Sequence, residues 1–251
     1  MEHAPFQCNS KLLGVDVKKI LWILALPVSL CALPSGGEVL SGSVEFVPSA
    51  QTLEIRADGA AVIQWESFDI AEGESVSFIQ LNGESAIENH VEGDVTVCAG
   101  SCSSNAPLVL INDQGWDIQG VLQVSGGVIR LKGQQVRLRD GAVLDVSSEN
   151  GGGVISIMQG IPLIEIEAGA QLLANGIDRA GGGAIYLYAD DQLFFYGSAS
   201  ARGGDLRSNG GKIALTGWNA LHAPEEGPQV DVSAPMGRAG IIRIYPVEEM
   251  R

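Results

Sequence analysis

Glycine-led segments recur in this sequence at a spacing of about 28 residues, and this repeat constrains the fold more than any other feature. Gly141-Ala-Val-Leu, Gly169-Ala-Gln-Leu and Gly197-Ser-Ala-Ser begin 28 residues apart. A second marker, a glycine followed by a four-residue apolar-rich strand, recurs at Gly153, Gly183, Gly211 and Gly240, with spacings of 30, 28 and 29. A repeat of this length is typical of a solenoid, in which each coil stacks on its neighbour.

The segments between these glycines read as β-strands. Thr52–Arg56, Ser75–Ile79 and Val128–Leu131 alternate apolar and polar residues with period two and are rich in β-branched side chains. No stretch of 11 residues after Ser43 shows a convincing helical period. The sequence therefore predicts an all-β protein.

Together, the strands and the repeat predict a right-handed parallel β-helix of roughly seven or eight coils. A β-propeller needs blades of roughly 40 residues, and an immunoglobulin-like sandwich would not show glycines in fixed phase. Corresponding residues of successive coils should stack, so we expect one internal ladder made of Ile155, Ile185, Ile213 and Ile242.

The N-terminal residues resemble an export signal. Lys18 and Lys19 precede the apolar run Ile20–Leu30, and small residues follow around Cys31. This run is shorter than the ~20 residues that span a bilayer. We expect residues 1–31 to be an N-terminal extension and signal peptide, and residues 32–251 to be the β-helix domain; lipidation of Cys31 and a later start codon are the open alternatives.

The charge excludes one broad class of partner. The chain carries 15 basic and 30 acidic residues, a formal net charge of −15. Such a field repels nucleic acid and anionic lipid, so nucleic-acid binding is not expected.

Two cysteines remain after the predicted signal, in the segment Cys98-Ala-Gly-Ser-Cys102. In an oxidising compartment this spacing suits a local disulfide, and the alternative is a pair of idle thiols. A metal site is not supported, because only His90 lies nearby.

Ala61–Gln80 carries a family resemblance. Ala61-Val-Ile-Gln-Trp-Glu-Ser-Phe-Asp-Ile70, followed by Gly73-Glu-Ser-Val-Ser-Phe-Ile-Gln80, resembles the haemagglutination-activity domain at the start of two-partner secretion exoproteins, the filamentous haemagglutinins. Further similar elements are Ala32–Val39, Ala86–Val91, Leu108–Gly115 and Gly240–Pro246. The turn Asn112-Asp113-Gln114-Gly115 keeps the first and last residues of the family's Asn-Pro-Asn-Gly.

The resemblance implies a secreted or cell-surface structural protein of the adhesin type. Its partner would be an outer-membrane pore-type transporter with periplasmic recognition modules, and its target a host-surface glycan or protein. It implies that Trp65, Phe68, Asn89, Asn112 and Gly115 serve secretion recognition and nucleation of the fold. Family members usually continue for many hundreds of residues, so a minimal exoprotein, a stub and one part of a split gene are all open.

The residues offer little enzyme chemistry, and we expect no catalytic activity, cofactor or metal. Asp190 and Asp191 form an adjacent carboxylate pair, but Asp is also a common turn residue, and the pair lies between two expected strands. For the aromatic residues Tyr186, Tyr188, Phe194, Phe195 and Tyr196, core packing is the main expectation and a glycan-stacking patch the alternative. The other functional interpretations are a β-helical carbohydrate-active enzyme and a scaffold that self-associates through an open C-terminal coil.

Overall fold

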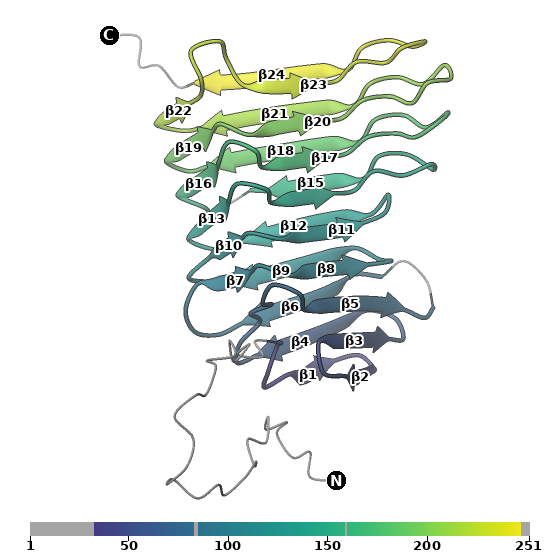
Figure 1. Ribbon diagram of the computed structural model, residues 1–251, viewed down its shortest axis with the longest axis vertical. Helices are drawn as coiled ribbons and strands as arrows, with labels where there is room; N and C mark the ends of the chain where they lie inside the picture. The colour runs from purple at the N-terminus through teal and green to yellow at the C-terminus, as the bar shows by residue number, and fades with distance from the viewer. Residues whose placement is uncertain (1–32, 83–84, 159, 247–251) are drawn as a thin grey trace, which may run out of the picture.

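The protein is a three-sided stack of short strands (Figure 1), as seen in a computed structural model that describes residues 33–82, 85–158 and 160–246. Three sheets run along the stack: within the described residues, sheets 1 and 2 contain nine strands each, and sheet 3 contains six. From β5 (Ser75–Gln80) onwards, the chain contributes one strand to sheet 2, one to sheet 1 and one to sheet 3, and then begins the next coil.

The strands of each sheet lie side by side in an order that follows the stack. Sheet 1 contains β1 (Glu38–Ser41), β4 (Ala61–Trp65), β6 (Ile87–Val91), β9 (Leu108–Asn112), β12 (Val128–Lys132), β15 (Val154–Ile157), β18 (Ala184–Ala189), β21 (Lys212–Gly217) and β24 (Ile241–Pro246). Sheet 2 contains β2 (Val44–Pro48), β3 (Thr52–Ala57), β5, β8 (Ser101–Ser104), β11 (Val121–Val124), β14 (Val143–Asp145), β17 (Gln171–Leu173), β20 (Ser198–Ser200) and β23 (Gln229–Asp231). Sheet 3 contains β22 (Ala220–His222), β19 (Gln192–Phe195), β16 (Leu163–Ile166), β13 (Gln135–Leu138), β10 (Trp116–Ile118) and β7 (Thr96–Cys98).

Strands of successive coils pair in parallel and in register, which makes the fold a parallel β-solenoid of about seven turns. The all-β prediction is confirmed. The predicted isoleucine ladder is confirmed too: Ile155 pairs with Ile185, Ile185 with Ile213 and Ile213 with Ile242. The first three are fully buried, whereas Ile242 on the last coil is 41% exposed. Among the described residues, no helix is long and apolar enough to cross a bilayer, and the predicted signal peptide lies outside them.

The repeated glycines stand where the backbones of successive coils leave no room for a side chain. A Cβ built on Gly153 would overlap the carbonyl oxygen of Gly127, one on Gly183 that of Gly153, and one on Gly211 that of Gly183. These contacts involve backbone atoms, which cannot move aside without breaking the pairing of neighbouring strands. Lack of space for a side chain thus explains why glycine recurs at this position of successive coils.

The N-terminal end of the solenoid is closed by two strands that run against the others. β1 pairs antiparallel with β4, and β2 pairs antiparallel with β3. Phe46 of β2 packs on the core and meets Trp65 edge to face, with ring centroids 5.4 Å apart. This cap covers the first coil, whose edges would otherwise be free to pair with another chain.

The glycine argument predicts opposite outcomes for two alanine substitutions in one loop. Gly183→Ala should lower the free energy of unfolding by about 1–3 kcal/mol, because its methyl group has no room between two backbones. Gly181→Ala should change it by less than about 0.5 kcal/mol, because a Cβ there would contact only the Asn209 carbonyl oxygen, at 3.6 Å. Urea denaturation followed by circular dichroism measures both. Equal effects would contradict the steric explanation.

Candidate functional site

Most of the predicted recognition residues lie side by side in the first coils. Trp65, at the end of β4, meets Phe68 edge to face at 5.4 Å between ring centroids. Phe68 stacks on Phe78 at 6.1 Å and meets Trp116 edge to face at 6.4 Å. All four side chains are at most 2% exposed. Together with Phe46 they form the aromatic core of the N-terminal coils.

Asn89 places an amide inside this apolar interior. Its Oδ1 accepts a hydrogen bond from Trp65 Nε1 at 3.0 Å, and its Nδ2 donates to the carbonyl oxygens of Ile87 and Val109, at 3.4 Å each. The residue is fully buried. A buried amide is stable only when its polar atoms are paired, so these bonds fix the register of β4, β6 and β9.

Asn112 holds the turn that follows β9. Its Nδ2 donates to the Asp94 carbonyl oxygen at 2.9 Å and to Thr96 Oγ1 at 2.7 Å. Its Oδ1 accepts from the backbone N–H groups of Gln114 at 2.8 Å and Gly115 at 3.3 Å. One buried side chain therefore ties its own turn to the turn of the preceding coil.

Gly115 completes the turn with φ +122°, in the region that favours glycine. A Cβ there would also overlap the Gln135 carbonyl oxygen of the next coil. Trp116 follows at once, and its Nε1 donates to the Lys132 carbonyl oxygen at 2.9 Å. Both the conformation and the space thus require glycine at this position.

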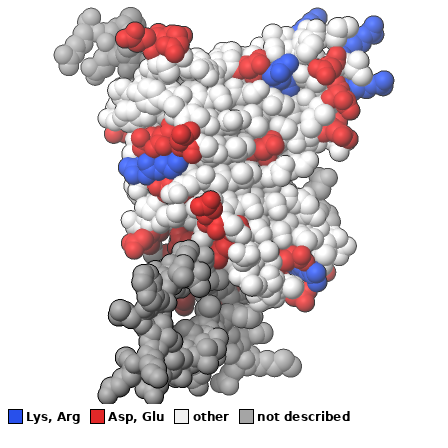
Figure 2. All heavy atoms as spheres, viewed as in Figure 1, with Lys and Arg blue, Asp and Glu red and all other residues white. Residues whose placement is uncertain are grey.

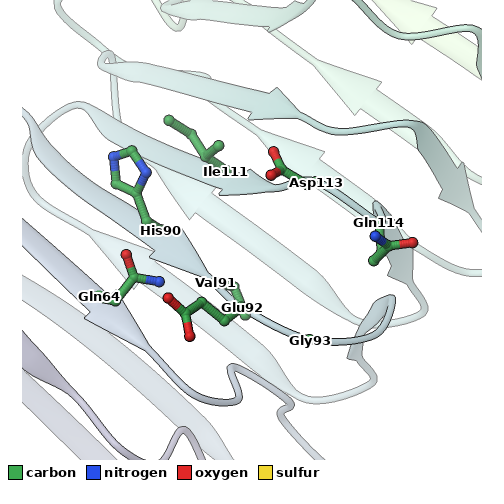
Figure 3. A pocket seen from close by; sticks show the side chains of 8 residues that line it. All are labelled: Gln64, His90, Val91, Glu92, Gly93, Ile111, Asp113 and Gln114. Atoms are coloured by element: carbon green, nitrogen blue, oxygen red, sulfur yellow. The ribbon is translucent and has the colours of Figure 1, made fainter.

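A polar cleft of about 320 Å³ lies beside this turn. Figure 3 shows Glu92 and Gly93 of one turn and Asp113 and Gln114 of the next, with His90 on the adjoining strand. The cleft is lined by Gln64, His90, Val91, Glu92, Gly93, Ile111, Asp113 and Gln114. Its carboxylates and amides can bind basic or hydrogen-bonding groups of a partner.

The side chains that line the cleft do not form a cluster of metal ligands. No group of three metal-ligating side chains lies together anywhere in the described part of the chain. His90 is engaged by Glu88, with Nε2 and Oε1 2.6 Å apart. No local motif in the sequence predicts this cleft, because its lining comes from three successive coils, those of Gln64, His90 and Ile111. The outward positions of these residues on neighbouring strands were the available signal.

The structure separates the predicted recognition residues from the surface. Trp65, Phe68, Asn89 and Asn112 are at most 2% exposed, so a partner cannot touch these four side chains in the folded protein. Their roles in secretion stay predictions, and only a structural role is visible. Asp113 and Gln114, which stand between Asn112 and Gly115 in the turn, are exposed.

The predicted disulfide is not formed, because Cys98 and Cys102 are both free, buried thiols. Cys98 ends β7 and stacks on Ile118, whereas Cys102 in β8 stacks on Leu122, so each fills a place in an apolar ladder. Burial raises the pKa of both thiols, that of Cys102 to about 12. Cys98 and Cys102 therefore fit the alternative of two unreactive thiols, because a protonated thiol is a poor nucleophile.

Asp190 and Asp191 lie in the turn between β18 and β19, as predicted. Asp191 Oδ1 accepts a hydrogen bond from Asn219 Nδ2 of the next coil at 2.7 Å. The expectation that the nearby aromatic residues are mostly core was wrong. Only Phe195 is buried, while Tyr186, Tyr188 and Phe194 are partly exposed and Tyr196 is 43% exposed, because outward positions of the strands hold them.

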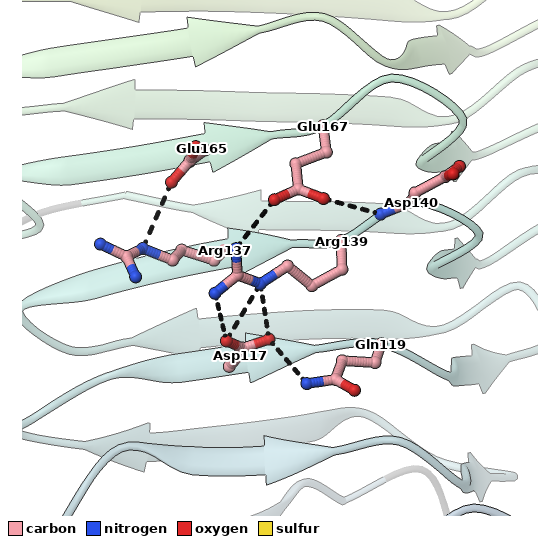
Figure 4. Close-up of polar contacts among 7 residues, drawn as sticks. All are labelled: Asp117, Gln119, Arg137, Arg139, Asp140, Glu165 and Glu167. Atoms are coloured by element: carbon pink, nitrogen blue, oxygen red, sulfur yellow. Dashed lines mark hydrogen bonds and ion pairs between the residues drawn. The ribbon is translucent and has the colours of Figure 1, made fainter.

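An ion-pair ladder crosses three coils on the outer face of sheet 3 (Figure 4). Arg139 of the middle coil binds Asp117 below through Nη2, at 2.6 Å, and Glu167 above through Nη1, at 2.8 Å. Hydrogen bonds to these carboxylates raise the pKa of Arg139. Its hydrogen bond lowers the pKa of Glu167, and it lowers that of Asp117 against the opposing effect of partial burial.

The strand pairing and closed N-terminal end define the class as a capped parallel β-solenoid. No family model matches the chain, and no curated protein matches it either. Among solved structures, the HMW1 secretion domain from Haemophilus influenzae is similar at 14% sequence identity and a TM-score of 0.35, over 83% of this chain and 100% of that one. At that TM-score, this likeness adds nothing to the fold described above.

Replacing Asn112 should destabilise the protein more than replacing its exposed neighbours. Asn112→Ala removes four hydrogen bonds and leaves buried partners unsatisfied, so we expect a loss of about 2–4 kcal/mol in the free energy of unfolding. Asp113→Ala and Gln114→Ala should each change it by less than about 0.5 kcal/mol. Urea denaturation of the three variants checks this. Losses of similar size would contradict the role given to Asn112.

The ion-pair ladder should stabilise the protein at neutral pH and cease to do so in acid. Arg139→Gln should lower the free energy of unfolding by about 1 kcal/mol at pH 7. The lowered pKa values of Asp117 and Glu167 mean that their contribution is present above the ordinary values of 3.8 and 4.5 and is lost as the pH falls below them. Denaturation curves from pH 7 to pH 2 should therefore show wild type and variant converging, whereas Arg137→Gln, with one ion pair at 3.3 Å, should have a smaller effect. A gap that stays constant would contradict this origin.

Proposed function

We propose that this chain is an exported, secreted or surface-attached structural protein of the two-partner secretion type. Its solenoid would act as the secretion domain, recognised by an outer-membrane pore with periplasmic modules, and the exposed rod would then serve adhesion to a host-surface glycan or protein. The proposal assigns no catalytic activity. Asp190 and Asp191, the carboxylates considered for glycoside cleavage, have the turn role described above.

The observation that carries this proposal is the arrangement of the residues on which the family resemblance rests. Trp65, Phe68 and Asn89 form one packed and hydrogen-bonded unit in the first coils. Asn112 and Gly115 shape the turn that follows β9, in the coil next to that of Asn89 and beside the polar cleft. The resemblance thus supplies residues that are both packed together and placed next to an accessible surface.

The fold also suits folding during export. After the N-terminal cap, each coil pairs only with the coils before and after it, so stability accumulates by nearest-neighbour contacts. A chain that emerges with its N-terminus first can close the cap and the aromatic core and then add coils in turn. Trp65, Phe68 and Asn89 are the residues we propose as the nucleus.

In this proposal, buried residues set the shape of the turn Asn112–Gly115, and exposed residues beside it contact the pore. Asn112 and Gly115 set the backbone, and Asp113, Gln114 and Glu92 offer two carboxylates and an amide to the partner. Acidic groups in a cleft favour a partner with basic side chains, and such complementarity mainly affects the rate and specificity of association.

Secretion should depend on the exposed part of the turn. Co-expression of the full chain with the cognate outer-membrane pore should release a mature form beginning near Ala32 into the medium or onto the cell surface. Asp113→Ala combined with Gln114→Ala should reduce the released fraction at least tenfold without changing the stability of the purified protein, whereas Glu149→Ala with Asn150→Ala, in another exposed turn, should not. Mass spectrometry and immunoblots of cell fractions measure this.

Retention of the wild type in the periplasm despite the pore would overturn the secretion proposal. Normal release of the Asp113, Gln114 variant would instead overturn the assignment of the contact surface.

A further inference from the structure

Three loops at the C-terminal end of the solenoid project from one edge of the rod, where sheet 2 passes to sheet 1 (Figure 1). They span residues 174–183, 201–211 and 232–240 and are called the flange. They are the last three of the connections that lead from sheet 2 to sheet 1. None of the residues on which the proposed secretion role rests lies in the flange, so its surface is unassigned.

The flange is a rigid stack rather than three independent loops. On the outgoing limb, Gly176 N–H donates to the Arg202 carbonyl oxygen and Gly203 N–H to that of Ser233, each at 2.8 Å. On the returning limb, Gly182 N–H donates to the Asn209 carbonyl oxygen at 2.9 Å. These bonds continue the coil spacing of ~4.8 Å into the loops and hold their tips in line.

Each tip presents one large apolar side chain to solvent. Ile177 is 44% exposed, Leu206 52% and Met236 65%. Single exposed apolar residues are ordinary, but three in corresponding loops of successive coils form a row. Burying such a row against an apolar phase would stabilise a complex through the hydrophobic effect.

Each tip also carries an arginine close in sequence to the apolar residue. Arg179, Arg207 and Arg238 are exposed, and none makes an ion pair with the described residues. The three loops contain four arginines and two aspartates, a net charge of +2 on a chain whose net charge is −15. Figure 2 shows most of the blue atoms on this face at the upper right, in the region of the flange, with red atoms among and beside them.

The backbone at two tips is unusual. Asp178 has φ 55° and Arg207 φ 52°, and they are the only non-glycine residues with positive φ in the described part of the chain. Leu206 N–H donates to the Asp178 carbonyl oxygen at 2.9 Å, so the two residues belong to one interlocked turn. Strained backbone of this kind is concentrated at sites that bind or switch.

We propose that the flange is a docking surface for the anionic headgroup layer of a lipid membrane. A row of arginines requires a negatively charged partner, and a parallel row of apolar side chains requires that this partner also offer an apolar phase. The flange projects outward (Figure 1). A cleft of about 230 Å³ lies between its first two loops, but neither Leu206 nor Met236 lines it, so a small molecule there would leave most of the apolar row exposed. A lipid interface meets all three conditions, because it is anionic, has an apolar layer beneath and deforms around a protruding edge.

The acidic remainder of the molecule sets the orientation. Repulsion between the acidic sheets and an anionic membrane would keep the rest of the rod away, so only the flange edge can approach. Attraction through exposed arginines is screened by salt, and binding should therefore weaken as ionic strength rises. The surface adds a second contact region to the secretion domain and does not depend on the route of export.

The test is sedimentation of the purified full chain with vesicles. Binding is expected with equal parts phosphatidylglycerol and phosphatidylcholine and not with phosphatidylcholine alone. The triple variant R179Q/R207Q/R238Q should bind about a hundredfold more weakly, since each basic residue near an anionic surface contributes about a factor of five. I177S/L206S/M236S should also lose affinity, at least tenfold. The matched control R56Q/R130Q/K132Q changes the net charge equally on other faces and should bind like wild type.

Circular dichroism and thermal melts establish that each variant is folded, and these outcomes are separate from those of the secretion assay. Equal binding to both kinds of vesicle, no binding to either, or an arginine variant no weaker than its control would overturn the proposal. If the apolar variant binds like wild type and inorganic phosphate displaces the protein at matched ionic strength, the flange is a simple anion site and the lipid-surface proposal is wrong.

Discussion

Backbone hydrogen bonding between identical places in successive coils is the constraint on which this structure depends. Parallel pairing brings each coil within ~4.8 Å of the next, and at the corners between sheets this spacing leaves no room for a side chain. Gly153, Gly183 and Gly211 make that approach possible, because any Cβ there would overlap a carbonyl oxygen of the preceding coil. Because these corners have no room for a side chain, glycine recurs there in successive coils, as the inward-facing isoleucines do on the strands that follow.

Repetition is the part of the fold that sequence reasoning could predict. The ladder from Ile155 to Ile242 was predicted from the spacing of the glycine markers, and the all-β parallel architecture from that spacing together with the period-two alternation of the strands. The N-terminal cap could not be predicted from the repeat, because β1 and β2 interrupt it. The aromatic residues near Tyr186 were misjudged because alternation in a strand shows that neighbours face opposite ways but not which of them face inward. The thiols of Cys98 and Cys102 occupy the place of small apolar residues, and sequence spacing could not distinguish that from a bridge.

The buried residues of the candidate site were named from the family resemblance, whereas the exposed residues that line the cleft were not predicted. Family resemblance identifies residues that the fold constrains, and in a solenoid these are interior groups such as Asn89 and Asn112, whose amides pair with the backbone of adjacent coils. Accessible residues such as Glu92 and Gln114 come together only when coils stack, so neither a motif nor a local spacing marks them. A paired interior amide also specifies register, because a slip of one coil or one residue would bury it unpaired.

Nearest-neighbour stacking also allows the two ends of the rod to serve different purposes. In a compact fold, a change at one surface strains a shared core, whereas here a loop contacts only the coils beside it. The turn near Asn112 can therefore keep its hydrogen-bonded geometry while the last three connections from sheet 2 to sheet 1 differ from it in length and composition. The composition is consistent with this independence, because arginines outnumber aspartates four to two in the flange of a chain whose formal net charge is −15. Hydrogen bonds between successive coils hold the turn near Asn112 and the flange in fixed positions along the rod. The side chains of the loops then determine what each region can bind.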